Sequence, residues 1–84
     1  MRAYDPNILS IWTLYDRPLD MPEHYVARRF EIRQGGEGGP THDYIRDSDL
    51  ESLRGEMVSR GLYCLGRQAG DDPKIIEIWL DIRA

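Results

Sequence analysis

The chain has 84 residues, of which 40% are hydrophobic and 31% charged, and its formal net charge at pH 7 is −4. This length predicts a single domain, residues 1–84, with one small core and no deep cleft. The acidic balance argues against general nucleic-acid binding, which needs a basic surface. No apolar run approaches the roughly 18–20 residues of a membrane helix. Because a lone Cys64 allows no internal disulfide, we expect a cytoplasmic protein of a bacterial host, with the thiol in the core.

The first predicted element is a strand over residues 8–15, ILSIWTLY. This segment is dense in β-forming residues and apolar on both faces, which is typical of a central strand. Residues 16–23 follow with two prolines, and proline fixes φ and removes backbone donors, so a loop is predicted there.

Residues 24–33, HYVARRFEIR, alternate with period two and predict a second strand. We expect its core face to carry His24, Val26, Arg28, Phe30 and Ile32. Arg29 then falls on the solvated face. Arg28 is the exception on the core face, and it either lies at the sheet end, snorkels past a helix or pairs with a carboxylate.

A glycine-rich segment and a helix come next. Residues 34–47 hold four glycines and a proline within six positions and predict a flexible loop. Residues 48–61 predict a helix that begins with an S-x-x-E capping box and ends at Gly61. Its expected buried stripe is Leu50, Leu53, Met57 and Val58.

Two further strands are predicted at 62–65 and 75–82, separated by a loop with a turn signal at GDDP. The order is β-β-α-β-β, and each strand pair reads as a hairpin. The expected fold is therefore α+β, with a mainly antiparallel four-stranded sheet covered on one face by a single helix.

No catalytic, metal or cofactor site is predicted. The segment GGEGGPT lacks the G-K-[ST] ending of a phosphate loop, and it leads into acidic residues. His24 and His42 have no further histidine or cysteine at a metal-ligand spacing. No serine is placed beside a histidine as a nucleophile with its base would be. We therefore expect no enzyme, although a small active site or ligand site at a homodimer interface stays open.

An acidic segment is the candidate functional feature. Residues 34–60 carry six acidic side chains against three arginines. One interpretation is a solvated surface whose charges suit the helix N-terminus. The other is a negative patch that binds the basic surface of a partner protein. Its residues are Asp43, Asp47, Asp49, Glu51 and Glu56.

The alternative function is a small single-stranded nucleic-acid-binding protein. Aromatic side chains on strands stack with bases, and arginines contact the phosphates. The residues for that site are Trp12, Tyr25, Arg28 and Arg29.

Two stretches, IWTLYDRPLDMPEHYVARR and GLYCLGRQAGDDPKIIEIWL, resemble a group of short bacterial and phage proteins. That group opens with W-T-[IL]-Y-D-x-P-x-D-x-P-x-x-[FY]-V-A-R and ends with D-D-P-x-I-x-E-x-W-L. The resemblance covers about half of the chain and implies a compact domain. By analogy of class, the size and acidity suggest an anti-CRISPR-like inhibitor that blocks the nucleic-acid-binding surface of a host CRISPR effector complex, without itself binding nucleic acid or membrane.

Overall fold

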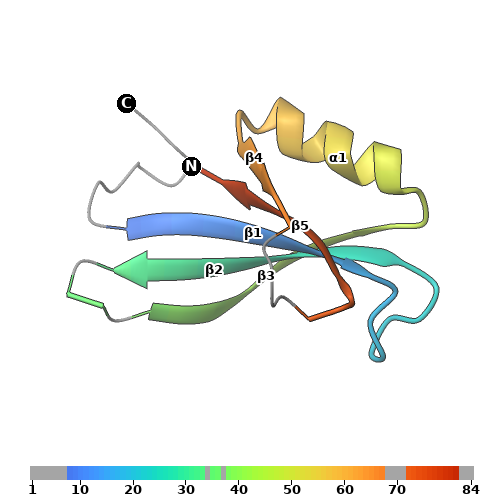
Figure 1. The fold of residues 1–84 in the computed structure, drawn as a ribbon, viewed down its shortest axis with the longest axis horizontal. Helices are drawn as coiled ribbons and strands as arrows, with labels where there is room; N and C mark the ends of the chain where they lie inside the picture. The colour runs from blue at the N-terminus through green and yellow to red at the C-terminus, as the bar shows by residue number, and fades with distance from the viewer. Residues whose placement is uncertain (1–7, 34, 37, 68–71, 82–84) are drawn as a thin grey trace.

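The computed structural model describes residues 8–33, 35–36, 38–67 and 72–81, which form one helix and five strands. The elements in chain order are β1 (Ile8–Asp16), β2 (Tyr25–Arg33), β3 (Gly38–Asp47), α1 (Leu50–Ser59), β4 (Tyr63–Gly66) and β5 (Ile75–Leu80). The strands form one antiparallel sheet in the order β3-β2-β1-β5-β4, with α1 on one side (Figure 1). The predicted α+β class and the central place of β1 are confirmed. The sheet has five strands, not four.

The additional strand is β3, which occupies most of the predicted loop 34–47. The glycines serve a tight hairpin: Gly36 has a φ of +88°, and its N–H donates to the carbonyl of residue 33 at 3.0 Å. A Cβ on Gly38 would lie 2.1 Å from the carbonyl oxygen of Glu31, so only glycine allows β3 to approach β2 there. Pro40 is tolerated because β3 is an edge strand. Glycine and proline therefore mark a hairpin here, and the loop prediction is wrong for this strand.

The N-terminus of α1 is capped by a residue other than the one predicted. Asp49 has an extended backbone, and its Oδ2 accepts a hydrogen bond from the N–H of Ser52 at 3.0 Å. The predicted capping box of Ser48 and Glu51 is wrong, because the helix begins one residue later, at Leu50. An aspartate N-cap gives the same benefit by satisfying one of the free N–H groups of the first turn.

The C-terminus of α1 ends as predicted, at a glycine. Gly61 has a φ of +76°, the left-handed conformation that glycine adopts without steric cost. Its N–H donates to the carbonyl of Val58 at 2.9 Å, and the N–H of Leu62 donates to that of Met57 at 3.2 Å. These two bonds are the pair that defines a Schellman motif. The motif turns the chain directly from the helix into β4.

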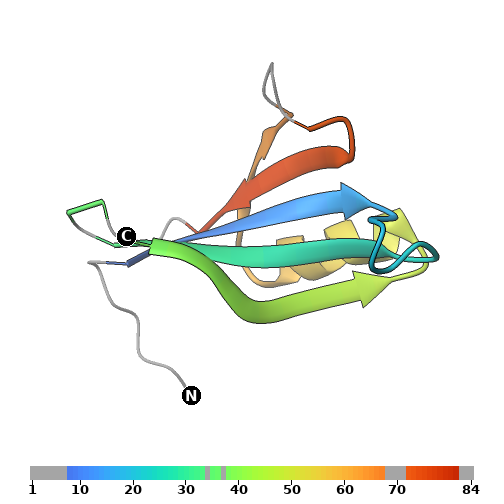
Figure 2. The same cartoon turned by 90° about the horizontal axis from the view of Figure 1, so that it is seen from below.

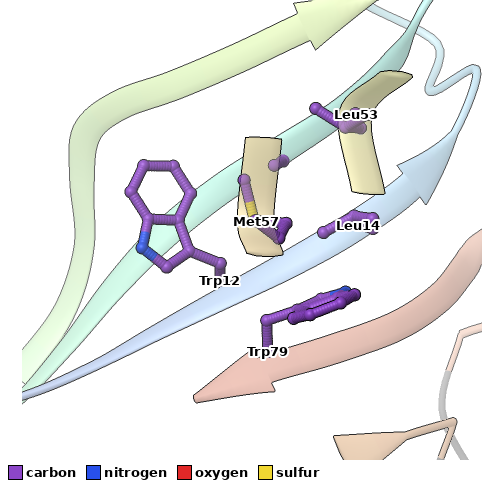
Figure 3. Packing of buried hydrophobic residues seen from close by; sticks show 6 residues of the cluster. Trp12, Leu14, Leu53, Met57 and Trp79 are labelled. Carbon is purple, nitrogen blue, oxygen red and sulfur yellow. The ribbon is translucent and has the colours of Figure 1, made fainter. Parts of the chain in front are cut away.

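The core lies between α1 and the centre of the sheet (Figure 3). Leu53 and Met57 of α1 are fully buried, and they pack against side chains from the three inner strands, β1, β2 and β5. The buried members of this cluster are Trp12, Leu14, Ala27, Leu53, Met57 and Trp79. Val58, predicted to belong to the buried stripe, is 64% exposed. The helix therefore contacts the sheet along a narrower side than the sequence pattern indicated.

The two faces of β2 are the reverse of those predicted. In the sheet register Ala27 lies beside Leu14 and Arg29 beside Trp12, so this set of β2 residues lies on the side that α1 covers. The set expected in the core, which includes Arg28, lies on the opposite side. Arg29 can lie on the helix side because Glu31 and Asp43 pair with its guanidinium there. Val26, from the set expected in the core, is still fully buried, although on the opposite side.

Truncating the core should separate buried from exposed positions of α1. Met57→Ala should lower the free energy of unfolding by about 2–5 kcal/mol, because it removes buried contacts and leaves a cavity. Its neighbour Val58→Ala should change it by less than about 0.5 kcal/mol. Urea unfolding followed by circular dichroism measures both. A loss of similar size in the two variants would contradict this placement of the helix.

Candidate functional site

A buried carboxylate joins α1 to β5. Glu77 is 7% exposed, and it accepts a hydrogen bond from the indole N–H of Trp79 at 2.7 Å. It also accepts two hydrogen bonds from the guanidinium of Arg54, from Nη2 at 2.8 Å and from Nε at 3.2 Å. The hydrogen bonds with Glu77, and then with Glu51, raise the pKa of Arg54. This pair fixes the helix across the sheet.

A second ion-pair cluster lies on the same side of the sheet and is centred on Arg29. This side chain, predicted to be solvated, is part of a residue that is only 7% exposed. It forms ion pairs with Glu31 at 2.8 Å and with Asp43 at 2.6 Å, and its Nη1 lies 3.3 Å from the hydroxyl of Ser10. Burial lowers the pKa of Arg29, but the hydrogen bonds to the two carboxylates outweigh it and raise the pKa. Arg29 therefore has a structural role.

Three of the five predicted acidic site residues serve the local structure. Asp43 binds Arg29, and Asp49 caps α1. Asp47 accepts a hydrogen bond from the N–H of Asp49 at 2.9 Å. The side chain of Ser52 is the main cause that lowers the pKa of Asp47, and the Asp49 N–H adds to it. The structure explains these three carboxylates without a partner protein.

The other two acidic residues lie on the outer surface of α1. Glu51 is bound to Arg54 at 2.6 Å, and Glu56 to Arg60 at 3.5 Å. Both carboxylates remain open to solvent, with 75% of the Glu51 side chain exposed. Exposed pairs of this kind contribute little to stability. Glu51 and Glu56 are thus the members of the acidic set that remain most available to a partner.

The four residues of the predicted nucleic-acid site do not share a surface. Trp12, Tyr25 and Arg29 lie on the side of the sheet that α1 covers, and Trp12 is buried there. Arg28 lies on the opposite side, where it binds the carboxylate of Asp20. The structure therefore does not bring these residues together as a stacking platform.

The side of the sheet away from α1 is also apolar, and no described helix or strand covers it (Figure 2). We call this surface the open face. Adjacent strands place large apolar side chains side by side on it, such as Ile11 between Phe30 and Leu80. Several are well exposed, including Ile32 at 44% and Tyr63 at 58%. Its apolar residues are Leu9, Ile11, Tyr15, Phe30, Ile32, Tyr44, Tyr63, Ile75, Ile78 and Leu80. Val26 is on the same side of the sheet but is fully buried.

The open face is hollowed into a shallow groove of about 480 Å³. Its walls come from β1, β2 and β5, and it ends at the glycines of the β2–β3 hairpin. The lining side chains include Ile11, Phe30, Ile32 and Ile78. Glu31 also borders the groove, but its carboxylate is engaged in ion pairs on the other side of the sheet. An apolar concave surface of this size is suited to packing against an apolar partner.

From the sequence, Phe30 and Ile32 of the open face were expected in the core, and no binding role was predicted for the surface as a whole. The available signal was that 8–15 and 75–82 are apolar on both faces, whereas only one helix was predicted to cover the sheet. A sheet with two apolar faces and one covering layer leaves one apolar face without cover. That count of layers would have pointed to this surface.

The described residues offer little for metal or thiol chemistry. No group of three or more His, Cys, Asp or Glu side chains that could hold a metal ion is found among them. Cys64 is exposed on β4, whereas the sequence favoured a core position. No helix in the described part of the chain is long and apolar enough to cross a membrane.

Comparison of the chain with protein-family models, with curated proteins and with solved structures gives no match. The candidate site therefore rests on the geometry and chemistry of the open face itself.

Removing the buried carboxylate at the α1–β5 junction should destabilise the protein. Glu77→Ala leaves the indole N–H of Trp79 unsatisfied and frees Arg54, so we expect a loss of about 2–3 kcal/mol in the free energy of unfolding. The matched change Glu51→Ala removes the exposed partner of the same arginine and should cost less than about 0.5 kcal/mol. Urea titration compares the two. Equal losses would show that burial of Glu77 contributes nothing.

The lowered pKa of Asp47 predicts an acid-dependent contribution to stability. Its ionised form is favoured in the folded state, so Asp47 stabilises the fold fully above its pKa in the unfolded chain, near 3.9. This stabilisation is lost as the pH falls through the lower pKa of the folded state. Asp47→Asn should therefore reduce the decline of unfolding free energy on acidification below about pH 4. Thermal unfolding across this pH range measures it. Parallel profiles for the two proteins would rule out the contribution.

Proposed function

We propose that this protein is a non-enzymatic protein-binding module whose main contact surface is the open face. The observation that carries the proposal is the run of neighbouring apolar side chains across four strands, with Ile32 and Tyr63 well exposed. Monomeric proteins rarely leave an apolar surface of this extent in water, and such surfaces mark interaction sites. Aromatic and aliphatic side chains at the centre of a patch are also what the cores of protein interfaces contain.

A second surface supports a narrower form of the proposal. Glu51 and Glu56 project from α1, on the opposite side of the sheet from the open face, and the chain has a net charge of −4. In this form the protein is an anti-CRISPR-like inhibitor from a phage or mobile element. Its acidic helix surface would occupy the basic surface on which a CRISPR effector complex holds nucleic acid. Because the two surfaces lie on opposite sides, substitutions can test each one separately.

The experiment is an affinity capture with the tagged full chain from lysate of its source organism, with and without nuclease, followed by titration of the captured protein. Ile32→Ser and Tyr63→Ser remove exposed apolar contacts from the open face without emptying the core. Each should weaken binding by about tenfold. Val58→Ser is the matched control, because it removes an apolar side chain of comparable exposure from α1. It should leave the affinity unchanged.

The acidic surface is tested in the same titration with the double variant Glu51→Gln, Glu56→Gln. Weaker binding by this variant alone would move the contact surface to α1 and support the inhibitor of a basic effector. Unchanged affinity in all open-face variants would refute the open face as the contact surface. Capture that disappears on nuclease treatment would favour the nucleic-acid-binding alternative instead.

A further inference from the structure

One corner of the open face carries positive charge. Arg46 on β3 lies beside Val26, and Arg28 on β2 lies beside Tyr44, so the two arginines occupy neighbouring positions on the same side of the sheet. Arg28 binds the carboxylate of Asp20. Arg46 is exposed and forms no ion pair with any described residue. The corner therefore holds one arginine whose charge is not balanced.

The rest of the open face offers Arg46 no counter-charge. The residues that β1, β2 and β5 place on this side are aliphatic or aromatic, apart from Thr13 and Arg28. A partner that covers the face removes water from the surroundings of Arg46. This costs free energy unless the partner supplies an acceptor, and a carboxylate is the best one for a guanidinium.

A second copy of the chain does not meet this need. Two open faces packed by a two-fold axis would set the arginine corner of one copy against either apolar residues or the same corner of the other copy. Asp20, the one acidic group bound at the corner, is already used by Arg28. Burial would therefore leave Arg46 unpaired or facing a like charge, and both are unfavourable.

The form of the partner follows from the layers of the fold. One side of the sheet is covered by an amphipathic helix, and the other side is apolar and hollowed along β1 and β2. A second helix would complete a third layer, which is a common way to cover a sheet. Val26 is fully buried, so the exposed part of this face along β2 runs from Arg28 to Ile32. These residues are four positions apart, which is roughly 13 Å, and about 9 residues of α-helix span that distance.

We propose that the open face binds an amphipathic helical segment of another protein, with an apolar side that lies in the groove and an acidic side chain that meets Arg46. This inference rests on the proposed function of the open face and adds the chemistry of the partner. The apolar contacts supply affinity, and the arginine corner selects for acidic segments and sets their direction across the sheet.

The test uses three synthetic amphipathic peptides of about 16 residues with the same leucine stripe and with Glu, Gln or Lys at all polar positions. Each is titrated into the isotope-labelled full chain, and NMR shifts locate the contact. The Glu peptide should bind about tenfold more tightly than the Lys peptide, with shifts in β1, β2 and β5. Arg46→Glu should reverse this preference. Arg60→Glu, the same charge change on the α1 side, should not.

Five outcomes would overturn the inference. Equal binding of all three peptides on the open face would remove the acidic preference and leave the proposed function standing. Tighter binding of the Lys peptide, or shifts confined to α1, would contradict the charge argument. A stable dimer by light scattering, with its open faces protected, would assign the surface to a second copy. No peptide binding, together with weaker capture of the host protein by Ile32→Ser, would refute the acidic helical partner. It would leave the open face as the contact surface.

Discussion

The length of α1 limits how much of the sheet the protein can cover by itself. Ten residues of α-helix are about 15 Å long, whereas a nine-residue strand such as β1 is about 30 Å long. One helix therefore covers about half the length of one face and none of the other. The side chains on the remaining surfaces decide which surfaces are satisfied by contacts within the chain and which leave apolar groups exposed to water.

The two uncovered surfaces are treated differently. On the helix side, beyond the end of the apolar cluster, Arg29 joins Glu31 and Asp43, so every buried charge there has a partner. None of the buried polar side-chain atoms in the described residues lacks a hydrogen bond. On the open face the side chains are mainly apolar, and Arg46 forms no ion pair with any residue in the part of the chain that the structure describes. The buried charges on the helix side are satisfied within the chain, whereas the open face exposes apolar side chains to water, and we propose that a partner covers it.

The sequence predicted elements better than it predicted faces. The helix with its glycine end and the central strand β1 follow from local signals, namely the apolar stripe, Gly61 and a run of β-forming residues. The faces of β2 do not follow from local signals, because Arg29 on the helix side is paired with the carboxylate of Asp43, 14 residues further along the chain. Nothing in the alternation of β2 shows that ion pair. Strand β3 was hidden for a related reason, since its glycines and Pro40 have the composition of a loop, and only pairing with β2 makes them a strand.

The strand that the sequence hid also controls the candidate site. Arg46 reaches the open face only because β3 pairs with β2 in a register that sets it beside Val26. If residues 38–47 were a loop, Arg46 would be one more solvated charge and the open face would be purely apolar. An apolar face accepts many partners, because the hydrophobic effect has no direction. An unbalanced arginine at its edge costs free energy with any partner that brings no acceptor. In the proposed complex, the hairpin therefore supplies the selectivity that the apolar groove lacks.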